Sequence, residues 1–194
     1  MSPMLRQTPS QTVGPFFVFG LIRGDEHVLV NDLTQGQRIM IHGHVLDGGG
    51  TAIDDAMVEI WQADAAGIFN HPGDPRHGDV DKHFRGFGRA GTSNREREYR
   101  FRTVKPGPVP WPEGGTQAPH VNMRIFARGM LLHLITRAYF SDESANARDP
   151  LLRSITDPER RRTLIAVREA VQDAPTYRLD IHLQGDRETI FFSP

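Results

Sequence analysis

The sequence predicts an all-β protein: a two-sheet β-sandwich with long loops and one short helix in its C-terminal half. About seven or eight short segments alternate between apolar and polar residues, and Gly, Pro, Asn and Asp punctuate the intervals between them. A helical start signal followed by an apolar stripe occurs once, late in the chain. The 194 residues suffice for a full core, and no repeat or linker marks a second domain, so residues 1–194 are expected to form a single domain.

The first predicted strand, Arg38–Leu46, sets the pattern for the others. Ile39 and Ile41 share one face, while His42 shares the other face with His44, as in a strand of a two-layer protein. The DGGG sequence that follows is a strong turn signal. The other segments that alternate in this way are 56–63, 98–104, 120–127, 131–140, 177–184 and 188–192.

A long loop and a helix complete the predicted architecture. Residues 64–97 are polar and irregular, and a loop of this length inside a compact domain is usually functional or a partner contact. The helix is expected at 157–170. Asp157 can cap it and Pro158 suits its first turn, and an apolar stripe that includes Ile165 follows.

Composition excludes several classes of function. The formal net charge is −1, so no strong field attracts nucleic acid or an anionic membrane. There is no cysteine, which removes disulfides, thiolate metal ligands and a cysteine nucleophile. The N-terminal segment lacks a basic start followed by an apolar run, and no segment is apolar over the length of a bilayer. A cytoplasmic protein is expected.

The stretch 105–122, KPGPVPWPEGGTQAPHVN, is the most distinctive in the chain. Prolines are concentrated in it, and each proline ring fixes φ and removes a backbone donor. A stiff loop between two strands is a good platform for a functional site. On composition alone, a rigid crossover between two sheets is the simpler interpretation.

The histidines suggest one metal-dependent alternative. His42 and His44 point to the same side of their strand, as a metal-binding pair would. With His120 as a third ligand, the chain would be a stand-alone metal enzyme. A pair without a third ligand is more commonly a surface pair, or two histidines with hydrogen-bond partners.

Three sequence blocks, in order along the chain, resemble those of the intradiol ring-cleaving dioxygenases. They are Val58–Asp64 (VEIWQAD), Lys105–Pro108 (KPGP) and Ala118–Val121 (APHV), and the N-terminal segment Thr8–Pro15 (TPSQTVGP) and the end of the chain fit as well. Signatures of other enzymes are absent, since there is no Gly-x-Ser-x-Gly, phosphate-binding loop or dinucleotide fingerprint. Each block alone is a weak signal, but their order is specific and the resemblance covers nearly the whole chain. It implies a β-sandwich enzyme subunit that uses O2 to open catechol rings.

The resemblance also implies a non-haem Fe(III) ion held by two tyrosinates and two histidines. Tyrosinate suits ferric iron, because it is a hard anionic ligand. The family's four ligand positions fall on Phe69, Val109, His120 and Asn122. Phe69 and Val109 have no ligand atom, and Asn122 would be a poor neutral donor. This chain is therefore expected to bind no metal and to have no catalytic residue of its own. The iron would be carried by a homologous beta chain.

Within the family, the resemblance implies the role of an alpha subunit. It would pair with the beta chain in a heterodimer that assembles into a larger oligomer. The complex would act on protocatechuate and O2 and give 3-carboxy-cis,cis-muconate. Residues 1–20 would form an arm that packs on the partner and lines its substrate pocket with Thr12, Gly14, Pro15 and Phe16.

Arg128 is expected to complete that pocket, since a guanidinium can hold the carboxylate of the substrate through charge-assisted hydrogen bonds. Without the resemblance, Arg128 is a surface arginine at the end of a strand.

Phe16, Phe17 and Phe19 of the arm could equally cover the core of this chain instead of packing on a partner. A further possibility is a non-catalytic binding or structural sandwich that descends from the dioxygenases. Three tyrosines are expected in the core or at an interface: Tyr99, Tyr139 and Tyr177.

Overall fold

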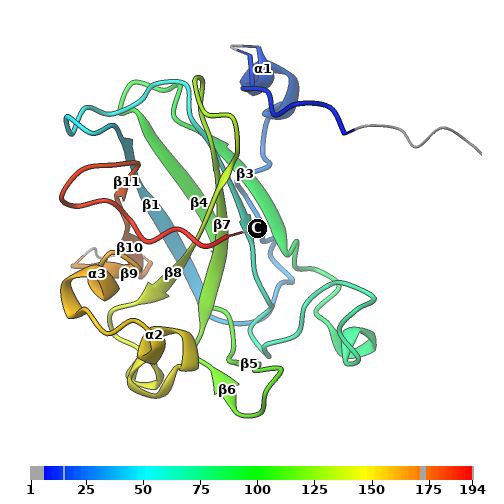
Figure 1. Cartoon of the computed structure of the whole chain (residues 1–194). Coiled ribbons are helices and arrows are strands. Elements are labelled where there is room, and N and C mark those ends of the chain that lie inside the picture. Colours follow the sequence, from blue (N-terminus) through cyan, green and yellow to red (C-terminus); the bar gives the residue numbers. More distant parts are fainter. Residues whose placement is uncertain (1–6, 15, 171–173, 194) are drawn as a thin grey trace, which may run out of the picture.

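The structure confirms the all-β class. The computed structural model describes residues 7–14, 16–170 and 174–193, and in these residues strands predominate over a few short helices (Figure 1). None of these helices is long and apolar enough to cross a bilayer. The helices are α1 (Phe17–Leu21), η1 (His77–Asp79), η2 (Ser144–Arg148), α2 (Pro150–Ser154) and α3 (Pro158–Arg162). The strands are β1 (Arg38–Leu46), β2 (Met57–Trp61), β3 (Phe87–Gly91), β4 (Glu98–Val104), β5 (Val109–Pro110), β6 (Thr116–Gln117), β7 (His120–Phe126), β8 (Leu134–Phe140), β9 (Ile165–Glu169), β10 (Thr176–Arg178) and β11 (Ile181–His182).

Nine of the strands join in one mixed sheet, while β5 and β6 form a separate two-stranded ribbon. Strand β1 pairs with β4 in antiparallel orientation and with β10 and β11 in parallel orientation. From β10 the sheet continues through β9, β8, β7 and β2 to β3. The detail of two separate sheets is therefore not confirmed. Strand β9 pairs with both β8 and β10 and joins the two layers into a continuous, nearly barrel-like sheet.

One apolar core fills the space inside this curved sheet. Ile41 and Phe101 of the β1–β4 pair belong to the same buried cluster as Ile60, Val121 and Ile125 of the β2–β7 pair. Burial alternates residue by residue along β1, as the sequence predicts. Removal of this apolar surface from water, at about 25 cal/mol per Å2, is the main favourable term in folding.

The prediction of a helix at 157–170 is correct only for its N-terminal part. Asp157 caps α3 by accepting hydrogen bonds from two of its backbone N–H groups, and Pro158 occupies the first turn. The segment Ile165–Glu169 is strand β9, so the second half of the predicted helix is wrong. Its β-branched residues suit a strand, and pairing with β8 and β10 supplies backbone partners that the local sequence does not reveal.

Other elements also differ from expectation. The sequence predicts one helix, and the structure has α1 near the N-terminus and α2 before α3 as well. The segment 177–184 divides into β10 and β11, and between them the carboxylate of Asp180 accepts a hydrogen bond from the backbone N–H group of His44. Strand β3 lies inside the predicted loop 64–97. Residues 188–192 form no strand; Phe192 forms a bridge to β8, and Thr189 forms hydrogen bonds with the backbone of His182 in β11.

The two ends of the sheet carry different parts of the molecule. The β5–β6 ribbon lies at the lower end in Figure 1, whereas α1 and the turns near 47–55, 92–97 and 127–133 lie at the upper end. Strand β7 runs between the two ends. Its seven residues, at about 3.3 Å each, separate them by roughly 20 Å.

Candidate functional site

The four positions that the resemblance assigns to iron ligands lie at the lower end of the sheet. Phe69 and Val109 line a hollow of about 690 Å3. Asn122 lines an adjoining hollow of about 560 Å3, and Trp61 lines both. His120 precedes Asn122 by two residues on β7 and so shares its face of the strand. The fold thus brings together segments that lie far apart in the sequence.

The loop that carries Phe69 is built around the buried carboxylate of Asp64, which accepts hydrogen bonds from three backbone N–H groups. The backbone N–H group of Gly107 donates to the carbonyl oxygen of Asp64 at 2.9 Å. Gly67 has a φ of 79°, and a Cβ atom there would lie 2.0 Å from the carbonyl oxygen of Pro108. The two loops therefore meet backbone to backbone, which fixes the walls of the hollow relative to each other.

Asp74 fixes the far side of the same loop. Its carboxylate accepts hydrogen bonds from the backbone N–H group of Phe69 at 3.1 Å and from the backbone and guanidinium of Arg76. Burial alone would raise the pKa of this carboxyl group, but the hydrogen bonds from Arg76 and Phe69 outweigh it and lower the pKa to about 2. The carboxylate is a structural anchor of this loop.

Asp74→Asn is expected to lower the free energy of unfolding at neutral pH by about 2 kcal/mol, the size of a hydrogen bond to a charged group. The folded-state pKa lies below the free value of 3.8. The stabilisation by the ionised Asp74 carboxylate is therefore complete above about pH 4 and is lost as the pH falls toward 2. Urea unfolding of the unaltered chain and of Asp74→Asn across this pH range measures the difference in stability. Asp79→Asn, at an exposed carboxylate of the same loop, is the control. An equal difference at every pH would contradict the assignment.

Gln117 ties the β5–β6 ribbon to the main sheet. Its amide nitrogen donates to the carbonyl oxygen of Pro110 at 2.9 Å, and its amide oxygen accepts from the guanidinium of Arg137 at 2.8 Å. Arg137 also donates to the hydroxyl of Tyr139, which in turn donates to the buried carboxylate of Asp149. These polar groups bond to one another, so the hollow offers a ligand mainly its aromatic and apolar wall.

His120 is the one residue here that matches the family's ligand set. It is buried, and its Nδ1 atom lies 2.8 Å from the carbonyl oxygen of Ala118, so Nδ1 carries the proton and Nε2 keeps the lone pair. Burial, and then the charge of Arg137, lower the pKa of His120 to about 4, so the imidazole is neutral at physiological pH. A neutral imidazole could act as a metal ligand only with other donors beside it.

The remaining three positions do not supply those donors. The side chains of Phe69 and Val109 are hydrocarbons, and Phe69 stacks on Trp61 with ring centroids 5.9 Å apart. The amide nitrogen of Asn122 donates to the carbonyl oxygen of Trp61 at 3.3 Å. One imidazole and one neutral amide do not fit ferric iron, which needs hard anionic ligands.

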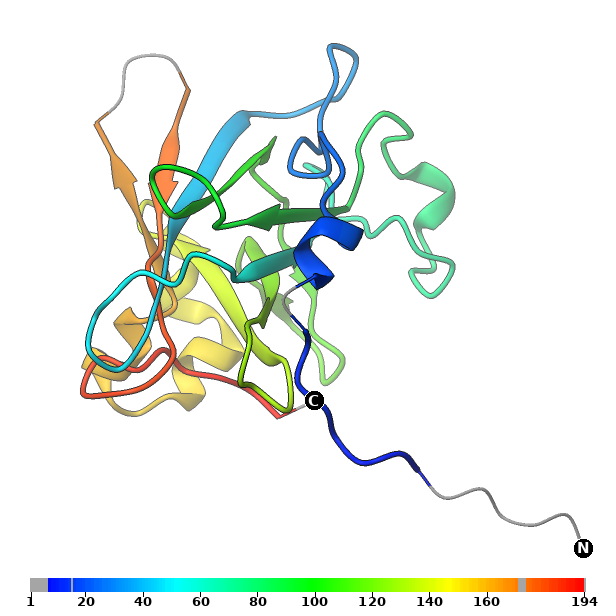
Figure 2. The same ribbon diagram turned by 90° about the horizontal axis from the view of Figure 1, so that it is seen from above.

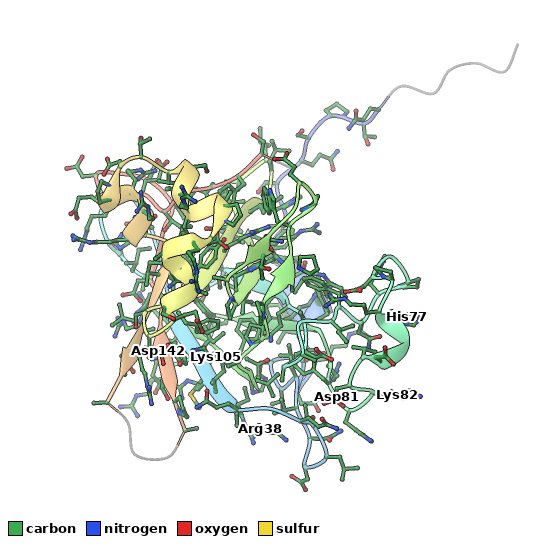
Figure 3. All side chains as sticks on the ribbon, turned by 90° about the horizontal axis from the view of Figure 1, so that it is seen from below. Arg38, His77, Asp81, Lys82, Lys105 and Asp142 are labelled. Atoms are coloured by element: carbon green, nitrogen blue, oxygen red, sulfur yellow. The ribbon has the colours of Figure 1, made fainter. Side chains whose placement is uncertain are left out.

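The three tyrosines are all used in the core. Tyr99 donates to a backbone carbonyl, while the hydroxyls of Tyr139 and Tyr177 donate to carboxylates. The partner of Tyr177 is Asp142, which also lies beside Lys105 at 3.2 Å (Figure 3). Burial, and then the bond to Asp142, raise the pKa of Tyr177 to about 12. All three side chains are fully buried, which confirms the interpretation as core residues.

His42 and His44 have carboxylate partners instead of a metal-like arrangement. The ring of His42 lies between two carboxylates, the nearer at 3.0 Å, and Nδ1 of His44 lies 3.4 Å from Asp180. Among the residues that the structure describes, no group of three or more histidine, aspartate or glutamate side chains is arranged to hold a metal ion. The combination of this pair with His120 is therefore not supported.

The arm and Arg128 lie at the upper end of the sheet. The hydroxyl of Thr12 accepts a hydrogen bond from the backbone N–H group of Gly129 at 2.8 Å, which anchors the arm at the turn after β7. Arg128 forms an ion pair with Asp55, and its side chain remains 57% exposed. Pro15 lies outside the described residues. Thr12 therefore lies beside the turn that Arg128 and Gly129 form after β7.

The phenylalanines of α1 do not all cover the core. Phe16 and Phe19 are 78% and 75% exposed, with ring centroids 6.5 Å apart, whereas Phe17 is partly buried. Gly14 is also exposed, and the segment before α1 leads away from the sheet (Figure 2). The alternative that these rings cover the core of this chain is therefore wrong for Phe16 and Phe19. Exposed apolar groups of this size are typical of an interaction surface.

Known proteins resemble this chain along nearly its whole length. The family model described as Dioxygenase matches residues 13–185. A protocatechuate 3,4-dioxygenase alpha chain from Burkholderia cepacia is 42% identical, over 97% of this chain and 98% of that protein. A protocatechuate 3,4-dioxygenase beta chain from the same organism is 34% identical, over 77% of this chain and 66% of that protein.

The fold is shared with a solved dioxygenase domain from Streptomyces sp. SirexAA-E. The TM-score is 0.62 at 21% identity, over 92% of this chain and 99% of that one. The sequence blocks, the strand arrangement around the lower hollow and these similarities agree. The chain therefore belongs to the intradiol ring-cleaving dioxygenase family, and within that family its similarity runs almost end to end along protocatechuate 3,4-dioxygenase alpha chains.

Proposed function

We propose that this chain is the alpha subunit of a protocatechuate 3,4-dioxygenase and binds no iron itself. With an iron-bearing beta chain it would form the enzyme that cleaves 3,4-dihydroxybenzoate with O2 to 3-carboxy-cis,cis-muconate. The single observation that carries the proposal is the chemistry of the four ligand positions, at which a neutral imidazole is accompanied by two hydrocarbon side chains and an amide. In a chain so similar to alpha chains, this composition supports a subunit that contributes recognition and assembly.

The upper end of the sheet supports the recognition role. Thr12 anchors the arm beside Arg128, and Gly14, Pro15 and Phe16 follow directly along the chain. An arm that is held at one residue, here Thr12, and has exposed residues nearby is suited to enter the pocket of a neighbouring chain. The guanidinium of Arg128 is exposed enough to meet the carboxylate of protocatechuate.

The distance between the two ends of the sheet also supports a chain that contributes recognition and not the metal site. Arg128 follows the end of β7 that lies roughly 20 Å from His120, so it does not line the hollow of its own chain. Recognition residues placed there would serve a site in another chain. Residues 1–194 would then act as one domain whose arm, residues 1–20, packs on the beta chain. The heterodimers would assemble further in the cytoplasm.

Iron content and the visible spectrum test the proposal, measured on this chain alone and after co-purification with a beta chain. We expect the isolated chain to be colourless and free of iron. We expect the complex to hold iron, to show the red-brown colour of ferric tyrosinate and to consume O2 with protocatechuate. His120→Gln in this chain is expected to leave the iron content of the complex unchanged.

Two results would contradict the proposal. Stoichiometric iron and colour in the isolated chain would place the metal ligands among its own histidines and tyrosines. A folded chain that forms no complex and supports no turnover with any beta chain would favour a non-catalytic binding or structural protein of dioxygenase descent.

A further inference from the structure

A recess of about 600 Å3 opens at the upper end of the molecule, beside α1. Three arginines line it: Arg95 and Arg97 come from the turn between β3 and β4, and Arg128 follows β7. The first two lie in the segment 64–97, which the sequence predicts to be a long irregular loop, and none of the family's sequence blocks includes them. The other lining residues are Phe19, Asp54, Asp55, Ser93 and Asn94.

The β3–β4 turn holds its arginines on a fixed backbone. The hydroxyl of Ser93 donates to the carbonyl oxygen of Asp54 at 2.7 Å, which ties this turn to the β1–β2 connection. The side chain of Asn94 bonds to both the backbone N–H and the carbonyl group of Glu98, at 3.1 and 2.6 Å. The turn is therefore closed by its own side chains, and the arginine side chains remain available to solvent.

Arg97 has an unusual backbone conformation. Its φ is 55°, and among the described residues it is the only non-glycine residue with a positive φ. This left-handed conformation costs a residue with a Cβ atom about 1–2 kcal/mol. Strained residues of this kind gather at functional sites. In this conformation, Arg97 is part of the lining of the recess.

The charges in the recess do not cancel. Arg128 pairs with Asp55. Within the described part of the chain, neither Arg95 nor Arg97 has a carboxylate at ion-pair distance, and the guanidinium of Arg97 makes only a 3.5 Å contact to a backbone carbonyl. Asp54 is the other carboxylate of the lining, and Glu96 of the same turn does not line the recess. Three guanidinium groups against two carboxylates leave the recess cationic.

We propose that Arg95 and Arg97 attract the carboxylate of the aromatic substrate and guide it toward Arg128. The inference rests on the proposed function, in which Arg128 meets that carboxylate in the completed pocket. Both arginines are positioning residues, because they would raise the local concentration of the anion without contacting its reacting atoms. Cations that lack partners in a concave surface increase the rate at which an oppositely charged ligand arrives.

The test is the double variant Arg95→Gln, Arg97→Asn in the complex with a beta chain. Asparagine tolerates the left-handed conformation, so the charge of Arg97 is removed without added strain. We expect kcat/KM for protocatechuate to fall about three- to ten-fold at low ionic strength, with kcat at saturation unchanged. At 1 M salt, where charges are screened beyond about 3 Å, the difference should disappear. Replacing both arginines with lysine should restore most of the loss.

The control removes the same charge at the lower end of the molecule. Arg148→Gln, Arg153→Gln alters two exposed arginines near α2 and is expected to leave kcat/KM unchanged. An equal loss in the control, a loss that persists at high salt, or no loss at all would overturn the inference. If the unaltered complex holds iron and turns over protocatechuate in those cases, the proposed function stands. If no active complex forms, the proposed function itself fails.

Discussion

Gly67→Ala is expected to lower the free energy of unfolding by about 3–5 kcal/mol. The φ of 79° is unfavourable for alanine, and the new Cβ atom would lie 2.0 Å from the carbonyl oxygen of Pro108. That oxygen belongs to the backbone of the Pro-rich loop, which prolines hold stiff, so the collision cannot be relieved by a side-chain rotation. Urea unfolding measures the change. The contact between the loop that carries Phe69 and the Pro-rich loop that carries Val109 would be disrupted first.

Two other glycines separate backbone strain from collision. Gly50 has a φ of 80° but open space around it, so Gly50→Ala tests the backbone conformation alone and is expected to cost about 1 kcal/mol. Gly78 lies in the same long loop as Gly67, with open space and no positive φ, and Gly78→Ala should have almost no effect. A cost at Gly67 no larger than the cost at Gly50 would show that the two loops are not in close contact.

Arg128→Ala is expected to lower kcat/KM for protocatechuate about 10- to 100-fold in the complex with a beta chain. A charge-assisted hydrogen bond is worth about 1.5–3 kcal/mol, and 1.36 kcal/mol corresponds to a factor of ten. The iron content of the complex should not change, because Arg128 lies at the end of β7 remote from the lower hollow. Steady-state kinetics and metal analysis of the same preparation give both values.

The ion pair with Asp55 provides the matched control for Arg128. If the loss came only from breaking this pair, Asp55→Asn would reproduce it. We expect instead that Asp55→Asn retains kcat/KM, since it leaves the guanidinium free to meet the substrate. Arg128→Lys keeps the charge but loses the planar fork, and an intermediate value is expected. Unaltered kinetics in Arg128→Ala would remove this residue from the pocket.

Strands could be predicted from the sequence where their two faces have different surroundings. Strand β1 has one buried and one half-exposed face, and its predicted bounds are correct. Strand β3 reads FGRAG and shows no such pattern. It is a strand because β2 offers it a complete set of backbone partners. Strand β9 likewise depends on its backbone partners. These are β8 and β10, and the local sequence of β9 does not reveal that it pairs with them.

Some features of the candidate site could likewise be predicted from the sequence, whereas others depend on contacts between distant segments. The positions of the missing ligands follow from the resemblance, but the close contact of Gly67 with Pro108 depends on the fold. Asp149 precedes a proline, a capping signal that the sequence shows, and it caps α2. Its carboxylate also accepts a hydrogen bond from the backbone N–H group of Ala118, next to the strand of His120, and no sequence pattern indicates that second role.

Strand β7 begins at the hollow and ends at the turn that anchors the arm. Natural selection can act on the two ends of such a chain separately, because roughly 20 Å of strand lies between them. After a gene duplication, one copy could lose its metal donors while keeping every surface that the other copy needs. In a protein of this shape, chemistry and recognition can be inherited by different genes.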